Sequence, residues 1–172
     1  MEELAVASAS DMRALGRRLA GHLRPGDLVV LNGPLGAGKT TLVQGIGQGL
    51  NVRGPITSPT FVIARVHPPL GPPPDPGPAL VHADAYRLGG AAEVDDLDLD
   101  ADLDTAVTVV EWGGGLVEGL TDDRLEVTIS VPSAGPGDAE DAGSGADESR
   151  IVRLHGVGAR WARAGSSPAT AS

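Results

Sequence analysis

The sequence predicts an α/β fold in which helices flank a mainly parallel β-sheet, with antiparallel strands completing the sheet at its C-terminal side. Three observations lead to this prediction. Residues 28–31 form a short apolar run, and a glycine-rich loop and a helical segment follow it directly. Two further strand-like runs, 79–84 and 105–110, each lead to an acidic residue. Residues 124–131 alternate polar and apolar side chains, a pattern typical of antiparallel strands.

Length and composition limit the possible classes of protein. At 172 residues the chain is expected to form one domain over residues 1–164, followed by a disordered tail at 165–172. It contains no cysteine, which excludes disulfide bonds and thiolate metal sites. The formal net charge of −10 argues against direct binding of nucleic acid, because that binding depends mostly on Lys and Arg. Neither a signal peptide nor a membrane-spanning segment is recognisable, so a cytoplasmic protein without membrane contact is expected.

The N-terminal segment predicts a helix that covers the sheet. Apolar residues recur at helical spacing among arginines over residues 9–23. Ser10 is the expected N-cap of this helix. Residues 24–27 predict a turn that leads into the strand at 28–31.

The loop after that strand has a complete phosphate-binding pattern, GPLGAGKT, at residues 33–40. Glycines allow the backbone to direct consecutive N–H groups at phosphate oxygens, and the following helix adds its positive N-terminal end. Lys39 is the only lysine beside twelve arginines, and it would neutralise the β- and γ-phosphates. The Thr40 hydroxyl would ligate Mg²⁺. The expected nucleotide-binding residues of this segment are Gly33, Gly36, Ala37, Gly38, Lys39, Thr40 and Thr41.

The middle of the chain combines a strand with two segments of unusual composition. Residues 61–66 predict a strand after the polar segment 56–60. Residues 67–78 hold seven of the fourteen prolines, which predicts an extended surface insertion, with a ligand for a proline-recognising domain as the alternative. Residues 93–104 contain seven acidic residues and no basic one. They lack the central glycine and terminal glutamate of a calcium loop, so a solvated acidic face is favoured, open to a basic partner.

The C-terminal part predicts the remaining strands. Residues 105–110 are β-branched and apolar, as in a buried strand. The alternating strand 124–131 is expected at a sheet edge, open on one face. Residues 132–149 predict a flexible linker. A last strand at 151–154 and a short helix at 159–162 follow.

Two acidic residues are candidates for the chemistry that a phosphate loop serves. Magnesium-dependent nucleotide hydrolysis needs carboxylates near the γ-phosphate. Asp84 and Glu111 each follow an apolar run, at the edge where a parallel sheet opens its binding site. A lone acid after a strand can also serve as a helix cap or a loop residue, and for Asp84 this remains the alternative.

Four motifs occur in a fixed order: GPLGAGKTT at 33–41, SPTF at 58–61, HADAYRL at 82–88 and VEW at 110–112. Together they resemble the TsaE family, the small ATPase of bacterial tRNA threonylcarbamoyladenosine synthesis. The resemblance covers residues 33–112, and flanking elements from about 9 to 131 fit it as well. It implies a P-loop NTPase-like fold with ATP and Mg²⁺ as cofactors.

The resemblance also implies roles for individual residues. Lys39 and the loop amides would hold the ATP phosphates, and Thr40 and Glu111 would ligate Mg²⁺. Thr60 would belong to a switch-like segment near the γ-phosphate. Asp84 would polarise the attacking water or hold the metal through water. These assignments make Lys39, Thr60, Asp84 and Glu111 the expected catalytic residues.

Two ring side chains beside these motifs allow more than one interpretation. Trp112 would pack next to the nucleotide, with a core aromatic as the alternative. His82 fits a buried structural histidine as well as a functional one.

The family's activity implies partners. ATP hydrolysis in this family does not make the modified base, and it serves the turnover or assembly of a complex with the TsaB and TsaD proteins, which act on tRNA. The resemblance therefore implies an ATP-binding, slowly hydrolysing subunit required for this modification in tRNAs reading ANN codons. Such a subunit would meet tRNA only indirectly through the complex, in keeping with the acidic charge.

Three other functions could use a phosphate-binding loop. A small-molecule kinase usually closes a lid with several arginines over the phosphoryl group, but only Arg124 is available between residues 88 and 149. A GTPase is excluded more firmly, because its Asn-Lys-x-Asp element needs a second lysine. A nucleotide-binding assembly factor without significant hydrolysis remains a full alternative.

Overall fold

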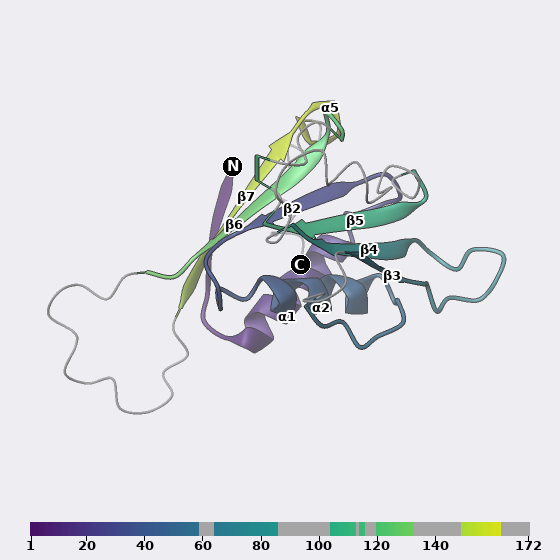
Figure 1. Ribbon diagram of the computed structural model, residues 1–172, viewed down its shortest axis with the longest axis horizontal. Helices are drawn as coiled ribbons and strands as arrows, with labels where there is room; N and C mark the ends of the chain where they lie inside the picture. The colour runs from purple at the N-terminus through teal and green to yellow at the C-terminus, as the bar shows by residue number, and fades with distance from the viewer. Residues whose placement is uncertain (59–63, 86–103, 113, 116–119, 133–148, 163–172) are drawn as a thin grey trace, which may run out of the picture.

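The computed structural model describes residues 1–58, 64–85, 104–112, 114–115, 120–132 and 149–162. A seven-stranded sheet with the order β1-β7-β6-β2-β5-β4-β3 organises them (Figure 1). Its strands are β1 (Glu2–Val6), β2 (Leu28–Asn32), β3 (Ala64–His67), β4 (Ala79–Asp84), β5 (Ala106–Glu111), β6 (Arg124–Ser130) and β7 (Arg150–Val157). The helices are α1 (Ala9–Ala20), α2 (Lys39–Gly49) and α5 (Ala159–Ala162).

The centre of the sheet is parallel and its flanks are antiparallel, which confirms the predicted fold class. Strand β2 pairs in parallel with both β5 and β6, and β4 pairs in parallel with β5. Strands β3, β7 and β1 join antiparallel to their neighbours. The prediction that 124–131 lies at a sheet edge is wrong, because β7 and β1 extend the sheet beyond β6.

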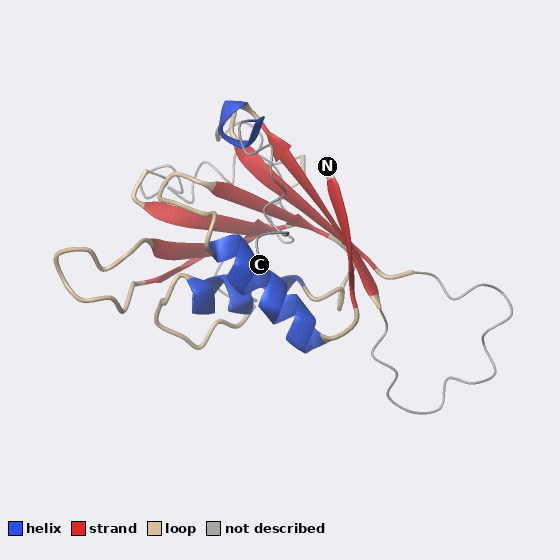
Figure 2. Ribbon diagram, turned by 180° about the vertical axis from the view of Figure 1, so that it is seen from behind, coloured by secondary structure: helices blue, strands red, loops and turns tan. Residues whose placement is uncertain are grey.

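Helices α1 and α2 lie side by side on one face of the sheet (Figure 2). Their close approach depends on Gly45, where a Cβ atom would collide with the carbonyl oxygen of Arg13. The main hydrophobic core lies between these helices and the sheet, and it includes Met12, Leu15, Leu19, Leu42, Ile46, Val29, Leu31, Val109, Val127 and Ile129.

The opposite face of the sheet carries a smaller cluster of Leu28, Val30, Val81, Ala83, Ala85, Ala106 and Val110. The sequence predicts helices on both faces, and both long helices that the structure describes pack on the first face. Residues 86–103, which join β4 to β5, lie outside the described residues, as does most of the acidic segment. Among the helices that are described, none is long and apolar enough to cross a membrane.

The N-terminus differs from the sequence prediction in two respects. Residues 2–6 form β1, a strand that the sequence analysis does not predict. Helix α1 has Ser8 as its N-cap, not Ser10, because Ser8 Oγ accepts a hydrogen bond from the Asp11 backbone N–H at 3.1 Å. Since the helix begins at Ala9, Ser10 already lies within its first turn.

The proline-rich segment 67–78 joins β3 to β4 and extends away from the sheet (Figure 1). Its first residues contact the segment that follows α2. His67 ends β3, is 4% exposed and contacts the Arg53 carbonyl through Nδ1 at 2.9 Å. Pro69 forms an isolated bridge with Val52. The extended connection therefore starts after these contacts, whereas residues 133–148 of the predicted linker and the tail at 165–172 lie outside the described residues.

An ion pair fastens the C-terminal helix to the start of β2. Arg160 donates from Nε and a terminal nitrogen to the two carboxylate oxygens of Asp27, at 3.1 and 2.9 Å. It also donates to the His22 carbonyl at 2.7 Å. Trp161, the next residue, belongs to the main core. The C-terminal helix α5 is thus anchored to the residue that precedes the central strand β2.

Candidate functional site

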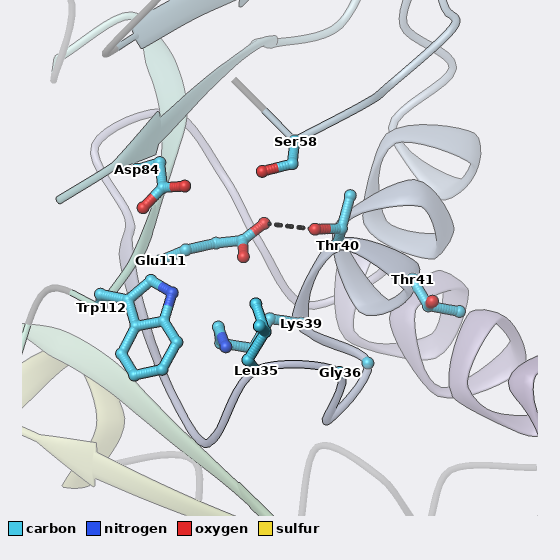
Figure 3. A pocket seen from close by; sticks show the side chains of 10 residues that line it. Leu35, Gly36, Lys39, Thr40, Thr41, Ser58, Asp84, Glu111 and Trp112 are labelled. Carbon is cyan, nitrogen blue, oxygen red and sulfur yellow. Dashed lines mark hydrogen bonds between the residues drawn. The ribbon is translucent and has the colours of Figure 1, made fainter. Parts of the chain in front are cut away.

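A pocket of about 520 Å³ lies where the parallel strands β4 and β5 end, beside the loop after β2 and the start of α2 (Figure 3). Ligands of open α/β sheets bind in this position, outside the carboxyl ends of the strands. The pocket is lined by Leu35, Gly36, Gly38, Lys39, Thr40, Thr41, Ser58, Asp84, Glu111 and Trp112.

The glycine-rich loop shapes one wall of the pocket. Gly33 has φ of 150°, and a Cβ atom there would collide with the carbonyl oxygen of Ile129. Gly38, with φ of 104°, is the N-cap of α2 and offers no side chain to the first-turn amides. Those N–H groups and the positive end of the helix therefore suit an anion. Ala37 is fully buried beneath the loop and does not line the pocket.

Lys39, the first residue of α2, lies across this wall. Its ammonium donates to the carbonyls of Gly33 and Pro34 at 2.9 and 3.0 Å. The same nitrogen lies 3.8 Å from the ring centroid of Trp112, a cation–π contact. The side chain is thus held by the loop on one side and by an aromatic face on the other.

The charge of Lys39 is influenced by its surroundings in two opposite ways. Burial lowers its pKa below the usual 10.5, because desolvation disfavours the charged form. The carboxylates of Glu111 and Asp84 raise the pKa, but the effect of burial is larger, so the pKa of Lys39 stays below 10.5. These two acids therefore lie close enough to Lys39 to act on it electrostatically.

Glu111 contacts side chains of both α2 and β4. Thr40 Oγ1 donates to Glu111 Oε1 at 2.9 Å, and Figure 3 shows this hydrogen bond spanning from helix to strand. His82 Nε2 lies 2.9 Å from the same oxygen. Glu111 is 3% exposed and His82 is 0% exposed, so both groups interact away from water.

Strand pairing explains how the two acids come together. In the parallel register of β4 and β5, Asp84 is the partner of Glu111. Both side chains therefore project from the same face of the sheet, toward α2. His82 precedes Asp84 by two residues and shares its face, because side chains alternate along a strand. The structure therefore buries His82 completely and places its ring in contact with Glu111, a predicted site residue.

Trp112 directly follows β5 and turns the chain sharply. Its φ of 60° is in the left-handed region, and its backbone N–H donates to the Leu31 carbonyl at 2.8 Å. This conformation places the indole over Lys39 at the pocket wall. Gly114, two residues later, donates its N–H to Asn32 Oδ1 at 3.2 Å.

The structure brings most of the predicted site residues into one pocket, with specific exceptions. Thr60 lies outside the described residues. Gly33 contributes its carbonyl to Lys39 and does not line the cavity. Two lining residues, Leu35 and Ser58, were not predicted to be in the site. Both lie within quoted motifs, and Leu35 is 92% exposed in the middle of the loop, so their positions in the motifs were the available signal.

Comparison with known proteins gives a consistent result. Residues 6–135 match the sequence profile of the family described as "Threonylcarbamoyl adenosine biosynthesis protein TsaE". The matched span includes every residue of the pocket.

Individual relatives agree with the family match. The tRNA threonylcarbamoyladenosine biosynthesis protein TsaE of Streptomyces coelicolor is 59% identical over 154 residues, covering 89% of this chain and 95% of that protein. The protein of the same name from Mycobacterium tuberculosis strain H37Rv is 53% identical over 125 residues, covering 69% of this chain and 73% of that protein.

A solved structure supports the fold. The crystal structure of YdiB from Bacillus subtilis superposes with a TM-score of 0.67 at 25% identity, covering 94% of this chain and 89% of that one. The P-loop arrangement on a mixed sheet agrees with the family match over most of the chain. It also agrees with relatives that are more than 50% identical over the aligned residues. The chain belongs to the TsaE family of threonylcarbamoyladenosine biosynthesis proteins.

Proposed function

We propose that this chain binds ATP and Mg²⁺ in the pocket beside Lys39 and hydrolyses ATP slowly to ADP and phosphate. The observation that carries the proposal is the convergence of Lys39, Thr40, Asp84 and Glu111 on one cavity. A cation, a hydroxyl and two carboxylates at the end of a parallel sheet match the requirements of phosphoryl transfer to water.

The residues present fit a triphosphate. The first amides of α2 and the Lys39 ammonium offer positive charge where phosphates would lie. A Cβ atom at Gly36 would meet no heavy atom within 4 Å, so the loop leaves open space on its pocket side. Lys39 would exchange its bonds to the Gly33 and Pro34 carbonyls for bonds to phosphate oxygens, which are stronger acceptors because they are charged.

The donor set also fits Mg²⁺. This ion prefers oxygen ligands and is commonly held by one or two carboxylates together with phosphates. Thr40 and Glu111, whose Oγ1 and Oε1 atoms are 2.9 Å apart, would hold it. Held by these two residues, Mg²⁺ would supply positive charge against the negative charge of the phosphates. Asp84, beside Glu111 in the sheet, would orient the attacking water or hold the ion through water.

Two further residues have proposed positions. Thr60, which follows Ser58 closely in the sequence, would lie near the γ-phosphate. Trp112 would stay next to the nucleotide and keep its indole against the Lys39 side chain.

The relatives are named for tRNA threonylcarbamoyladenosine biosynthesis, which gives the ATPase its proposed context. In this context the chain would act with the TsaB and TsaD proteins and approach tRNA only through their complex. The net charge of −10 supports an indirect contact, because direct binding to phosphate backbones depends on positive charge.

Phosphate release from Mg-ATP tests the proposal, measured for the purified chain alone and with TsaB and TsaD. Hydrolysis should fall to background in Glu111→Ala and rise when the partners are added. Glu126→Ala is the matched control, because Glu126 lies on β6 outside the pocket, where its carboxylate contacts Arg124 and His155 of β7. If ATP binds while hydrolysis stays at background in every mixture, the chain is an assembly factor and the catalytic assignments are wrong.

A further inference from the structure

We propose that His82 is a positioning residue for the metal site: it holds the carboxylate of Glu111 in the orientation that ligates Mg²⁺. The inference rests on the proposed function, because it assigns a supporting role within the same pocket. It concerns a side chain that does not line the cavity and whose role the sequence left open between structure and function.

The geometry gives Glu111 two anchors on one oxygen. Thr40 Oγ1 and His82 Nε2 each lie 2.9 Å from Glu111 Oε1. With Oε1 held from two directions, the plane of the carboxylate is fixed, and so is the direction in which its second oxygen points. Figure 3 shows that second oxygen on the pocket side of the group.

The two anchors differ in what supports them. Thr40 belongs to the helix that follows the phosphate loop, and its hydroxyl is itself a proposed metal ligand. His82 belongs to β4, where it pairs with Val109 in the ladder that also carries Glu111. The histidine therefore fixes the carboxylate to the rigid sheet, independently of how the loop adapts to a ligand.

Burial makes the histidine contact strong. The His82 side chain is 0% exposed, so its ring cannot replace this partner with water, and the Glu111 side chain is only 4% exposed. A carboxylate only accepts hydrogen bonds, so Nε2 carries the hydrogen that bonds Oε1. Nδ1 is buried and has no hydrogen-bond partner among the described residues, so within this part of the chain the ring of His82 makes its polar contact with Glu111.

Hydrogen bonds to metal-ligating groups determine affinity as well as orientation. Loss of such an outer partner typically weakens metal binding about 10–100-fold. His82 meets the requirement for such a partner: it touches a proposed ligand, is fixed by strand pairing and is shielded from solvent.

The test compares His82→Gln with His82→Asn. The amide nitrogen of Gln reaches the position of Nε2, whereas that of Asn stops near the position of Nδ1. Nucleotide binding is titrated calorimetrically with ADP at stepped Mg²⁺ concentrations and again in EDTA, and thermal unfolding is recorded for each variant. His82→Asn should raise the half-maximal Mg²⁺ concentration about 10–100-fold, while His82→Gln should stay close to wild type. ADP binding in EDTA should be the same for all three proteins.

His67 provides a matched control on the neighbouring strand. It is also buried and also has one ring nitrogen without a partner in the described part of the chain, but its Nδ1 contacts the Arg53 carbonyl and not Glu111. His67→Asn should lower the unfolding temperature and leave the Mg²⁺ dependence unchanged. If His82→Asn does not fold, His82→Met fills the space without a donor and takes its place in the comparison.

Each result has a definite meaning. The inference is overturned if a folded variant without a donor at the position of Nε2, His82→Asn or His82→Met, keeps the wild-type Mg²⁺ dependence. His82 would then be a core histidine. Equal losses in Mg²⁺ and EDTA, or a His82→Gln variant as impaired as His82→Asn, also overturn it, because they indicate a general structural effect. A wild-type chain whose ADP binding ignores Mg²⁺ contradicts the proposed metal site itself, and the inference fails with it.

Discussion

Thr40 Oγ1 and Glu111 Oε1 are hydrogen-bonded at 2.9 Å, although 71 residues separate them in the chain. The contact joins the first turn of α2 to the last residue of β5. It places a hydroxyl and a carboxylate, the two candidate metal ligands, next to each other in the pocket that Lys39 also lines.

Removing the Thr40 hydroxyl should weaken magnesium-dependent binding. Thr40→Val keeps the shape of the side chain and removes its oxygen, so we expect the affinity for Mg²⁺ with ADP to fall at least about tenfold. Thr40→Ser keeps the oxygen and should bind nearly as wild type does. Calorimetric titration of Mg²⁺ at fixed ADP measures both variants. Equal affinities for Val and Ser would show that Thr40 is not a ligand.

Lys39 is the only lysine of the chain, so its pKa can be measured without overlap and reports on the charges around it in the pocket. Glu111→Gln should lower the pKa of Lys39 further, because Glu111 raises it against the effect of burial. Between the lowered pKa and the usual 10.5, the folded chain binds fewer protons than the unfolded chain, so stability should rise as pH increases through this window. Carbon-13 labelling of lysine yields one side-chain signal to titrate by NMR. An unchanged titration in Glu111→Gln would contradict the proposed coupling.

Two loop glycines should respond differently to the same substitution. Gly33→Ala should destabilise the fold by about 2 kcal/mol or more, because it combines a positive φ with a collision against the Ile129 carbonyl. Gly36→Ala should cost only about 1 kcal/mol, since Gly36 has φ of 76° but open space around it. Urea unfolding measures the difference. Equal losses would mean that backbone strain alone sets the cost.

Buried His67 should make the fold sensitive to mild acid. Burial lowers the pKa of His67 below the usual 6.5, and the hydrogen bond to the Arg53 carbonyl offsets only part of this shift. As pH falls below 6.5, the unfolded chain gains a proton before the folded chain does, so stability should decrease. His67→Gln should flatten this decrease when urea unfolding is repeated from neutral to mildly acidic pH. An unchanged slope would show that other groups control it.

Local patterns predicted the site better than they predicted the sheet's edges. The loop at 33–40 and the strand 79–84 carry their signals within a few consecutive residues, and Asp84 and Glu111 follow from the ends of parallel strands. Strand β1 escaped prediction because its five residues acquire a partner only in β7, far along the chain. Strand β6 lies inside the sheet because it pairs with β7 as well as with β2, which the pattern within β6 does not show.

Contacts between side chains of the site depend on how separate strands pair with each other. That His82 and Asp84 share a face follows from their spacing along β4. The contact of His82 with Glu111 needs the register of β4 on β5, which no pattern within either strand contains. The choice between Ser8 and Ser10 as N-cap is a boundary question, and helix boundaries depend on local geometry that two nearby serines do not distinguish.

The pairing of β1 with β7 has a consequence for folding during synthesis. Among the described strands, β1 is translated before all others and β7 after all others, yet β1 pairs with β7. The elements that surround the pocket, from β2 to β5, leave the ribosome earlier. A nascent chain therefore contains the strands and the helix of the pocket before the strand that pairs with β1 has been made. Translation of residues 150–157 supplies that strand, and this side of the sheet can then form.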